Sequence, residues 1–480
     1  MQIHINALYN KFQPFFQGII WQRSGELIKN SILIRSSFPH GYIAGGQYAS
    51  DCTTVSYTKD KPEESLSSCE DETFWELHDA QGKVVERPVI LSCDPGRRAW
   101  NTVMGPMRNP DPLGGLWLYV PEPKVVWRKK TDPEPRILDT KLATNKAYRI
   151  TLKNYPQNHD FHPLGVEVWP SHGGNSSNLY VVNHARARTV VEHFVINPAN
   201  PTEAQHIRTI QSGYFRSANG LALTSPDAFY VSNDHLITRR MPFIGHFLPV
   251  IESVLGLPFG FISHITLNEY TSSESNAIAK ASFAKLFIPF PNGVALSSSG
   301  TEVAVASSSV SKIVIYERDP ETNELKYEKD VVTVPFVPDN LHFSPSSNSN
   351  SGEEIIVAGH PNFPDLTKVA ANVTGATSGS WVVAIVPKAE ENRQRSRRFD
   401  PDAPVSTSSK MIMDGENYTL HTLFQSNGKE AKGGFPGSTT GLVDPETRAL
   451  YVSGLYAKGG MIVCKPGSGN AKNSVRGKKK

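Results

Sequence analysis

One sequence pattern recurs along this chain and limits the folds that it can adopt. Residues 217–235 read "SANGLALTSPDAFYVSNDH", in which Asn-Gly precedes an alternating apolar run, a turn and a second apolar run. The same arrangement returns in "FPNGVALSSSGTEVAVASS", again opening on Asn-Gly. Alternating runs joined by a turn rich in Ser, Pro, Asp and Gly are typical of β-hairpins. Because the unit repeats, we expect a fold assembled from equivalent hairpins.

Further copies of this hairpin unit occur on both sides of the first two. Two of them carry longer turns, "PLGVEVWPSHGGNSSNLYVVNH" and "PDNLHFSPSSNSNSGEEIIVAGH", and a degenerate copy reads "CEDETFWELHDAQGKVVERPVILSCDP". Additional strand-like runs such as "TVVEHFVIN" and "SKIVIYERD" fill the gaps. Blades of about four strands repeated around an axis form a β-propeller. We therefore predict an all-β fold, a six-bladed β-propeller with a central tunnel, and five or seven blades are the alternatives. A large β-sandwich would not need the same opening dipeptide in each unit.

The predicted propeller spans residues 45–466. Residues 1–44 form an N-terminal segment in which a helix is expected, and residues 467–480 form a disordered basic tail. Residues 241–265 interrupt the repeat with an apolar, aromatic insertion whose middle, "HFLPVIESVLGL", predicts a short amphipathic helix. Three interpretations stay open for this insertion: a helix packed on the propeller, a lid over the central pocket, or a surface that contacts lipid.

The composition excludes several classes of partner. The chain has 49 Lys and Arg against 46 Asp and Glu, with the positive residues dispersed, so no nucleic-acid partner is expected. No apolar run reaches the roughly 18 residues that a membrane span needs. The first residues also lack the charged, apolar and small-residue regions of a standard signal peptide.

The four cysteines nevertheless suggest an exported protein. None forms a CxxC pair, which disfavours a zinc site, and an even number suggests disulfides with three possible connectivities. A bond between Cys52 and Cys464 would join the N-terminal strand to the last blade, and Cys69 would then pair with Cys93. We therefore expect a secreted protein or one of the secretory pathway. Three sequons permit glycosylation, at Asn175, Asn372 and Asn417.

Side-chain oxygens stand at the head of several repeat units. In a propeller these heads face one another at the central channel, although Asn and Asp are poor strand formers and a single Asn-Gly is ordinary turn chemistry. Carboxylate and amide oxygens without sulfur favour a hard cation, and Ca²⁺ fits best among the common ions. The heads that carry oxygens are Asn219, Asn292 and the pair Asp339-Asn340, with Glu70-Asp71 opening the degenerate first unit.

Several segments in this order resemble the serum paraoxonase/arylesterase family, which are six-bladed propellers with calcium in the central tunnel. The similarity runs from about Cys52 to Cys464 and is strongest in "CEDETFWEL", "LYVVNHARARTVVEHFVIN", "ANGLALTSPDAFYVSNDH", "PNGVALS", "VPDNLHFSP", "VAGHPN" and "PGSTTGLV". In that family a second, structural calcium has ligands that match Asp71, the carbonyl of Val166 and an aspartate at the position of Gly220. Since glycine offers no side-chain oxygen, we expect this second site to be lost or rebuilt with water. The family's catalytic calcium is held by residues that match Glu70, Asn219, Asn292, Asp339 and Asn340.

The histidines match the family unevenly. Its His-His dyad matches Leu164 and His184, so one partner is absent. His162 lies two residues before Leu164 and would point to the same face of a strand. The histidine of "AGHPN", His360, matches another histidine at the rim of the family's pocket. We predict His184 or His360 as the catalytic base, with His162 third.

The resemblance implies a calcium-dependent hydrolase of lactones or aryl esters. Calcium would polarise the carbonyl of a small-molecule substrate and a histidine would assist the attack of water. No GxSxG motif occurs, which disfavours an ordinary serine hydrolase. The alternatives are a strictosidine-synthase-like or gluconolactonase-like propeller enzyme and a propeller that only binds.

Overall fold

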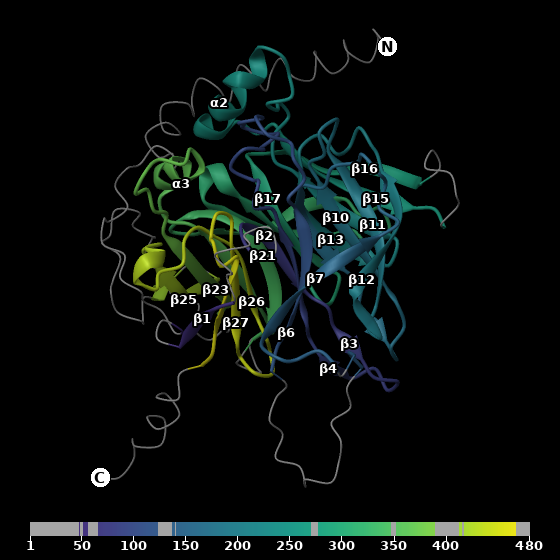
Figure 1. Cartoon of the computed structure of the whole chain (residues 1–480). Helices are drawn as coiled ribbons and strands as arrows, with labels where there is room; N and C mark the ends of the chain where they lie inside the picture. The colour runs from purple at the N-terminus through teal and green to yellow at the C-terminus, as the bar shows by residue number, and fades with distance from the viewer. Residues whose placement is uncertain are drawn as a thin grey trace, which may run out of the picture.

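The computed structural model describes residues 48, 51–55, 66–122, 137–139, 141–269, 277–346, 352–388, 412–414 and 417–466. The predicted N-terminal segment 1–44 and the tail 467–480 lie outside these residues. The described chain is built mostly from β-strands (Figure 1). It contains three separate four-stranded sheets, one five-stranded sheet and one eight-stranded sheet that divides where β7 and β12 pair in parallel. The predicted six-bladed β-propeller is therefore confirmed.

Each of the first four blades begins with its innermost strand and continues outward along the chain. The first blade holds β2 (Cys69–Phe74), β5 (Val89–Cys93), β6 (Gly115–Val120) and β7 (Lys146–Lys153). The second holds β8 (Pro163–Val168), β10 (Ser177–Asn183), β11 (Val190–Asn197) and β12 (Asn200–Ile210). The third holds β13 (Ala218–Ser225), β14 (Ala228–Asn233), β15 (Gly260–Leu267) and β16 (Ile278–Ile288).

The remaining three blades complete the ring. The fourth holds β17 (Pro291–Leu296), β18 (Glu302–Ser307), β19 (Lys312–Arg318) and β20 (Leu325–Thr333). The fifth holds β21 (Val337–Pro345), β22 (Glu353–His360), β23 (Ser380–Pro387), β25 (Tyr418–Ser426) and β24 (Ile412–Asp414). The sixth combines β26 (Ser438–Val443), β27 (Leu450–Gly454) and β28 (Met461–Cys464) with β1 (Cys52–Thr54). A small extra sheet holds β3 (Leu77–His78), β4 (Val84–Glu86) and β9 (Ser171–His172).

The last blade is closed by the first described strand. β1 pairs antiparallel with β28 in a register that places Cys52 opposite Cys464, and these two cysteines form a disulfide. A second disulfide joins Cys69 to Cys93 across β2 and β5 of the first blade. No free cysteine remains. The covalent link therefore connects the two ends of the ring.

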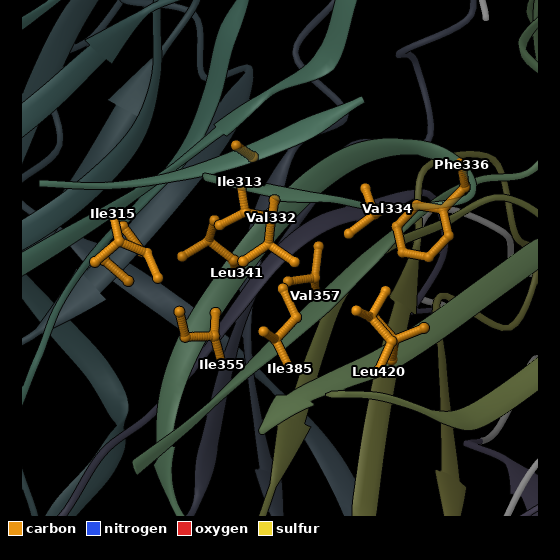
Figure 2. Packing of buried hydrophobic residues seen from close by; sticks show 14 of the residues in the cluster. Ile313, Ile315, Val332, Val334, Phe336, Leu341, Ile355, Val357, Ile385 and Leu420 are labelled. Carbon is orange, nitrogen blue, oxygen red and sulfur yellow. The ribbon is translucent and has the colours of Figure 1, made fainter. Parts of the chain in front are cut away.

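Apolar side chains fill the spaces between neighbouring blades. Figure 2 shows one such layer, in which Ile313 and Ile315 of the fourth blade pack toward Ile355, Val357 and Ile385 of the fifth. The strands involved carry β-branched residues at alternating positions, which suits a pleated surface buried on its faces. The packed blades hold the innermost strands in a ring, where β2, β8, β13, β17, β21 and β26 each contact their two neighbours.

The apolar insertion forms the short helix that its sequence predicts. α2 (Leu248–Leu255) follows the 3₁₀ turn η2 (Ile244–His246) and lies at the top of Figure 1, opposite β3 and β4. Pro249 is tolerated because it occupies the first helical turn, where its missing N–H has no partner to lose. The end of the insertion, however, belongs to β15. The other helical elements are α3 (Phe363–Ala370), η4 (Ser308–Val310) and η6 (Glu430–Lys432). None of the described helices is long and apolar enough to cross a bilayer.

A buried polar cluster inside the second blade is centred on Glu192 of β11. Its carboxylate accepts hydrogen bonds from Asn183 Nδ2 at 2.8 Å and Thr209 Oγ1 at 2.7 Å. The Nε2 atoms of His159 and His206 lie 2.6 Å and 3.0 Å from its two oxygens. Burial alone would raise the pKa of Glu192, but these hydrogen bonds outweigh it and lower the pKa to about 2. The cluster therefore stabilises the fold only while Glu192 is ionised.

We expect Glu192→Gln to lower the free energy of unfolding at pH 7 by about 3 kcal/mol, since each unit of pKa shift is worth about 1.4 kcal/mol. A carboxyl with a depressed pKa contributes fully above its unfolded-state value and loses the contribution as pH falls toward about 2. Urea unfolding at several pH values should therefore show the wild-type advantage shrinking in acid. Glu203→Gln, an exposed change in the neighbouring strand β12, is the control. Equal stability of Glu192→Gln and wild type at pH 7 would contradict the assignment.

Candidate metal and hydrolase site

A cavity of about 370 Å³ lies between the helical segments and the inner strands. Its floor includes Glu70 of β2, Asn219 of β13, Asn292 of β17 and Asp339 of β21, so four blades contribute polar side chains. These side chains meet because each stands near the start of the innermost strand of its blade. The walls are mainly apolar and include residues from both α2 and α3.

The polar side chains of the floor are connected across blades. Asn292 Nδ2 donates to Asp339 Oδ1 at 2.5 Å, and Asn340 Nδ2 donates to Glu70 Oε1 at 3.2 Å. Asn340 does not line the cavity itself, but this bond joins the fifth blade to the first. Asn219 shares the cavity and donates from Nδ2 to Asp234 at 3.4 Å. The structure therefore gathers all five residues that the sequence assigned to one ion.

Three buried oxygens of this group have no hydrogen-bond partner: Glu70 Oε2, Asn219 Oδ1 and Asn292 Oδ1. Buried polar atoms are almost always paired, so three orphaned acceptors in one cavity need a donor or a cation. Burial raises the pKa of Glu70 well above its usual range, and the neighbouring Asp71 and Asp339 carboxylates add to this shift. A divalent cation would supply the missing positive charge.

The chemistry of the donors fits Ca²⁺. Within the described parts of the chain, His, Cys, Asp and Glu side chains form no group of three or more that could hold a metal, so the donor set depends on the asparagine amides. Neutral amide and carboxylate oxygens in a flexible arrangement suit Ca²⁺, whereas Zn²⁺ prefers nitrogen and sulfur.

The second, structural calcium does not fit the residues present. Asp71 Oδ1 accepts from Thr440 Oγ1 at 2.9 Å, and Oδ2 accepts from the N–H of Val166 at 2.9 Å. The backbone N–H of Val166 is thus already a hydrogen-bond donor to this carboxylate. At Gly220, a Cβ would lie 3.2 Å from backbone atoms of β17, which is tight packing. Asp71 therefore stabilises the inner strands directly, and Gly220 supplies no side-chain oxygen in place of the missing ligand.

The candidate base His184 has both ring nitrogens engaged. Nδ1 lies 2.7 Å from Thr102 Oγ1, and Nε2 lies 2.7 Å from the carbonyl of Ala218. Because a carbonyl only accepts, Nε2 carries the hydrogen and Nδ1 accepts from the threonine. Burial lowers the pKa of His184 to about 4, which keeps the ring neutral. In this arrangement His184 has no nitrogen free for a substrate or water.

His162 is surrounded by hydrogen-bond acceptors. Its Nδ1 lies 3.0 Å from Asp94 Oδ2, and its Nε2 lies 3.1 Å from the carbonyl of Pro110 and 3.2 Å from Asp160 Oδ2. The ring also packs on Trp100, with 5.4 Å between the centroids. His162 lines the cavity beside Leu164, but its hydrogen bonds tie it to the surrounding loops.

His360 at the end of β22 has a nitrogen available. Its Nε2 lies 2.8 Å from Asp339 Oδ2, while its buried Nδ1 has no partner. The residue lines the cavity together with the orphaned oxygens. Of the three candidate histidines, His360 is the one with a ring nitrogen left for a ligand.

Comparison with known proteins places the chain in a family. The family model described as arylesterase matches residues 129–413, which is more than half of the chain. The chain belongs to the arylesterase family. It is 23% identical to serum paraoxonase/lactonase 3 of Oryctolagus cuniculus over 228 residues, which covers 47% of this chain and 56% of that protein. It is 28% identical to serum paraoxonase/arylesterase 1 of Homo sapiens over 158 residues, covering 33% and 39%.

The chain spans about half the length of the curated relatives it matches. A solved structure with a similar outline is the holo form of the pyranose dehydrogenase PQQ domain from Coprinopsis cinerea. That domain is 11% identical, with a TM-score of 0.44, and the match covers 89% of this chain and 98% of that one.

Sequence reasoning missed several residues of this arylesterase-family cavity. Asp94 and Thr102 bond to the candidate histidines from the connection between β5 and β6, where no strand repeat marks them. Asp234 lines the cavity directly after β14 and contacts Asn219. A signal for Asp234 was present in "SNDH", where two ionisable residues follow a buried strand, whereas nothing in the sequence distinguishes Asp94 or Thr102.

Proposed function

We propose that this arylesterase-family chain is a calcium-dependent hydrolase of lactones and aryl esters. The observation that carries the proposal is the set of three orphaned oxygens from three blades in one cavity. Glu70, Asn219, Asn292, Asp339 and Asn340 would hold the ion. Bound at these oxygens, Ca²⁺ supplies a Lewis acid toward the carbonyl of the substrate.

The protein's own groups supply the remaining parts of the reaction. His360 Nδ1 accepts a proton from the attacking water, and Asp339 holds the opposite ring nitrogen and fixes the tautomer. Trp100, Val103 and Leu164 line the cavity and accept the apolar part of a substrate. The same apolar walls exclude bulk water, which strengthens polar interactions within the site.

Metal content and hydrolysis measured on one purified sample test this function. We expect one tightly held calcium per chain, and we expect lactone hydrolysis to fall at least about 100-fold after chelation, since loss of a Lewis acid costs several kcal/mol. Added Ca²⁺ should restore the rate. Absence of calcium, or lactone hydrolysis that is indifferent to chelation, would overturn the proposal.

For His360→Gln we expect kcat to fall about 100- to 10,000-fold with calcium content unchanged, which is the usual contribution of a general base. Initial rates on a lactone and elemental analysis of the same preparation measure both quantities. His172→Gln, at an exposed position in the small extra sheet, is the matched control. If the His360→Gln protein kept wild-type kcat, a group other than His360 would have to accept the proton.

We also propose that the apolar insertion contacts a lipid surface. Phe243 is 86% exposed and Phe247 is 52% exposed, with Val250 and Ile251 of α2 also exposed. A short helix with apolar side chains facing outward suits an interfacial position.

The double variant Phe243→Ser, Phe247→Ser should sediment less with phosphatidylcholine vesicles than wild type. Tyr327→Ser, which removes an aromatic side chain exposed elsewhere, should bind like wild type. Equal sedimentation of all three proteins would refute the contact.

The two disulfides fit an extracellular or secretory location, and we propose export with glycosylation at the exposed sequons Asn175 and Asn372. Expression in a secreting eukaryotic host should give a protein whose electrophoretic mobility changes after removal of N-glycans. An unchanged mobility would contradict the glycosylation.

A further inference from the structure

A serine and an aspartate that line the cavity both contact one buried histidine. Ser253 Oγ in α2 lies 2.6 Å from His235 Nε2, and His235 Nδ1 lies 3.2 Å from Asp234 Oδ1. The contact between His235 and Asp234 is close enough for an ion pair, but its geometry is not that of a hydrogen bond, and neither of the two atoms has another hydrogen-bond partner. Such contacts often tighten only when a substrate binds. The three groups thus have the order and spacing of a nucleophile, a base and an orienting acid.

The fold holds this constellation in place. His235 is completely buried, and its ring packs edge-on against Phe290 with 4.5 Å between the centroids. The neighbouring helical residue Glu252 accepts hydrogen bonds from the backbone N–H groups of Leu236 and Ile237 at 3.2 Å and 3.5 Å. α2 is therefore fastened to the chain directly after His235, which fixes Ser253 over the imidazole.

The electrostatics of the pair suit a base that becomes cationic. Burial alone would lower the pKa of His235, but the Asp234 carboxylate, with smaller contributions from Glu252 and the carbonyl of Pro249, outweighs it and the net shift is upward. Ser253 Oγ also lies 3.0 Å from the carbonyl of Pro249, so its hydroxyl hydrogen has a second acceptor within reach. In the neutral tautomer that carries its hydrogen on Nδ1, facing Asp234, Nε2 is an acceptor at 2.6 Å and lies nearer to the hydroxyl than that carbonyl.

Ser253 and Asp234 both line the cavity of the proposed hydrolase site, beside Asn219 and His360. We propose that Ser253 is a nucleophile for a second, metal-independent esterase activity on aryl esters. Ser253 Oγ attacks the ester carbonyl carbon while its proton moves to His235 Nε2. The bond from the carbonyl carbon to the aryl oxygen then breaks, and the leaving phenoxide takes that proton. Water attacks the resulting acyl-serine by the same route, which releases the acid and restores the hydroxyl.

A fluorophosphonate, which reacts covalently with activated serines, tests this inference on the full chain. In calcium buffer and again with chelator, we expect a mass increase of one adduct per chain, located at Ser253 by peptide mapping. Ser253→Ala should show no adduct, and His235→Gln should label at least about 100-fold more slowly. Ser308→Ala is the matched control, because Ser308 lines the same cavity but donates to the carbonyl of Pro338 without a histidine. It should label like wild type.

Wild-type protein that gains no adduct, or an adduct that persists in Ser253→Ala, would overturn the inference. The labelling of wild type does not depend on whether any variant folds. Residual aryl-ester hydrolysis in chelator provides a second measurement, which Ser253→Ala should lower at least about 100-fold. Failure of the calcium mechanism would appear as lactone hydrolysis indifferent to metal and would leave the labelling intact. Failure of the serine route would leave metal-dependent lactone hydrolysis intact.

Discussion

Asn292→Ala is expected to lose the bound calcium and to lower kcat/KM for a lactone about 1,000-fold, which corresponds to about 4 kcal/mol of transition-state stabilisation. Asn292 Oδ1 is buried without a partner, and Nδ2 of the same amide holds Asp339 at 2.5 Å. The substitution therefore removes one donor oxygen and releases a second from its orientation. Elemental analysis and steady-state kinetics on the same sample measure the two effects.

Two further variants separate loss of the ion from loss of the fold. Asn292→Asp keeps an oxygen at the same place and should retain calcium, whereas Asn200→Ala removes an exposed amide at the start of β12 and should behave like wild type. Thermal unfolding of each variant in excess calcium monitors the fold. If Asn292→Ala retained both calcium and full lactone turnover, the ion would have to be held elsewhere.

Removal of the ring-closing disulfide by the double change Cys52→Ala, Cys464→Ala should lower the free energy of unfolding by about 4 to 5 kcal/mol. The two cysteines are 412 residues apart in sequence, so the bond restricts nearly the whole unfolded chain. The double change Cys69→Ala, Cys93→Ala opens a loop of only 24 residues and should cost less, about 3 to 4 kcal/mol. Denaturant unfolding of both double variants compares them. A Cys52, Cys464 variant as stable as wild type would contradict the role given to this bond.

The propeller and its polar floor could be predicted from sequence because both depend on repetition. Once Asn219, Asn292 and the pair Asp339-Asn340 were aligned at the head of each unit, any radial fold would bring them to one axis. The turns and alternating runs also indicated the hairpins, and a short helix within "HFLPVIESVLGL" followed from its apolar spacing, although its bounds come from the structure. Local patterns of this kind survive folding because neighbouring strands pair in sequence order.

The state of each histidine could not be predicted in the same way. The ring nitrogens of His184 are occupied by Thr102, which lies 82 residues upstream, and by a backbone carbonyl, and no periodic signal connects them. The contact between Ser253 and His235 likewise depends on how α2 docks after an irregular turn. Such long-range side-chain contacts arise from packing. The match to a motif therefore identified candidate histidines, but it could not determine which of their ring nitrogens is free.

The pairing of β1 with β28 also constrains how the protein can be made. On a ribosome, β1 emerges long before its partner β28, since 412 residues of sequence separate Cys52 from Cys464. The other five blades each use strands from one stretch of the chain, whereas the sixth cannot be completed before β28 is made. Until β28 is made, β1 has no partner in its sheet, and an unpaired strand edge can pair with another chain instead.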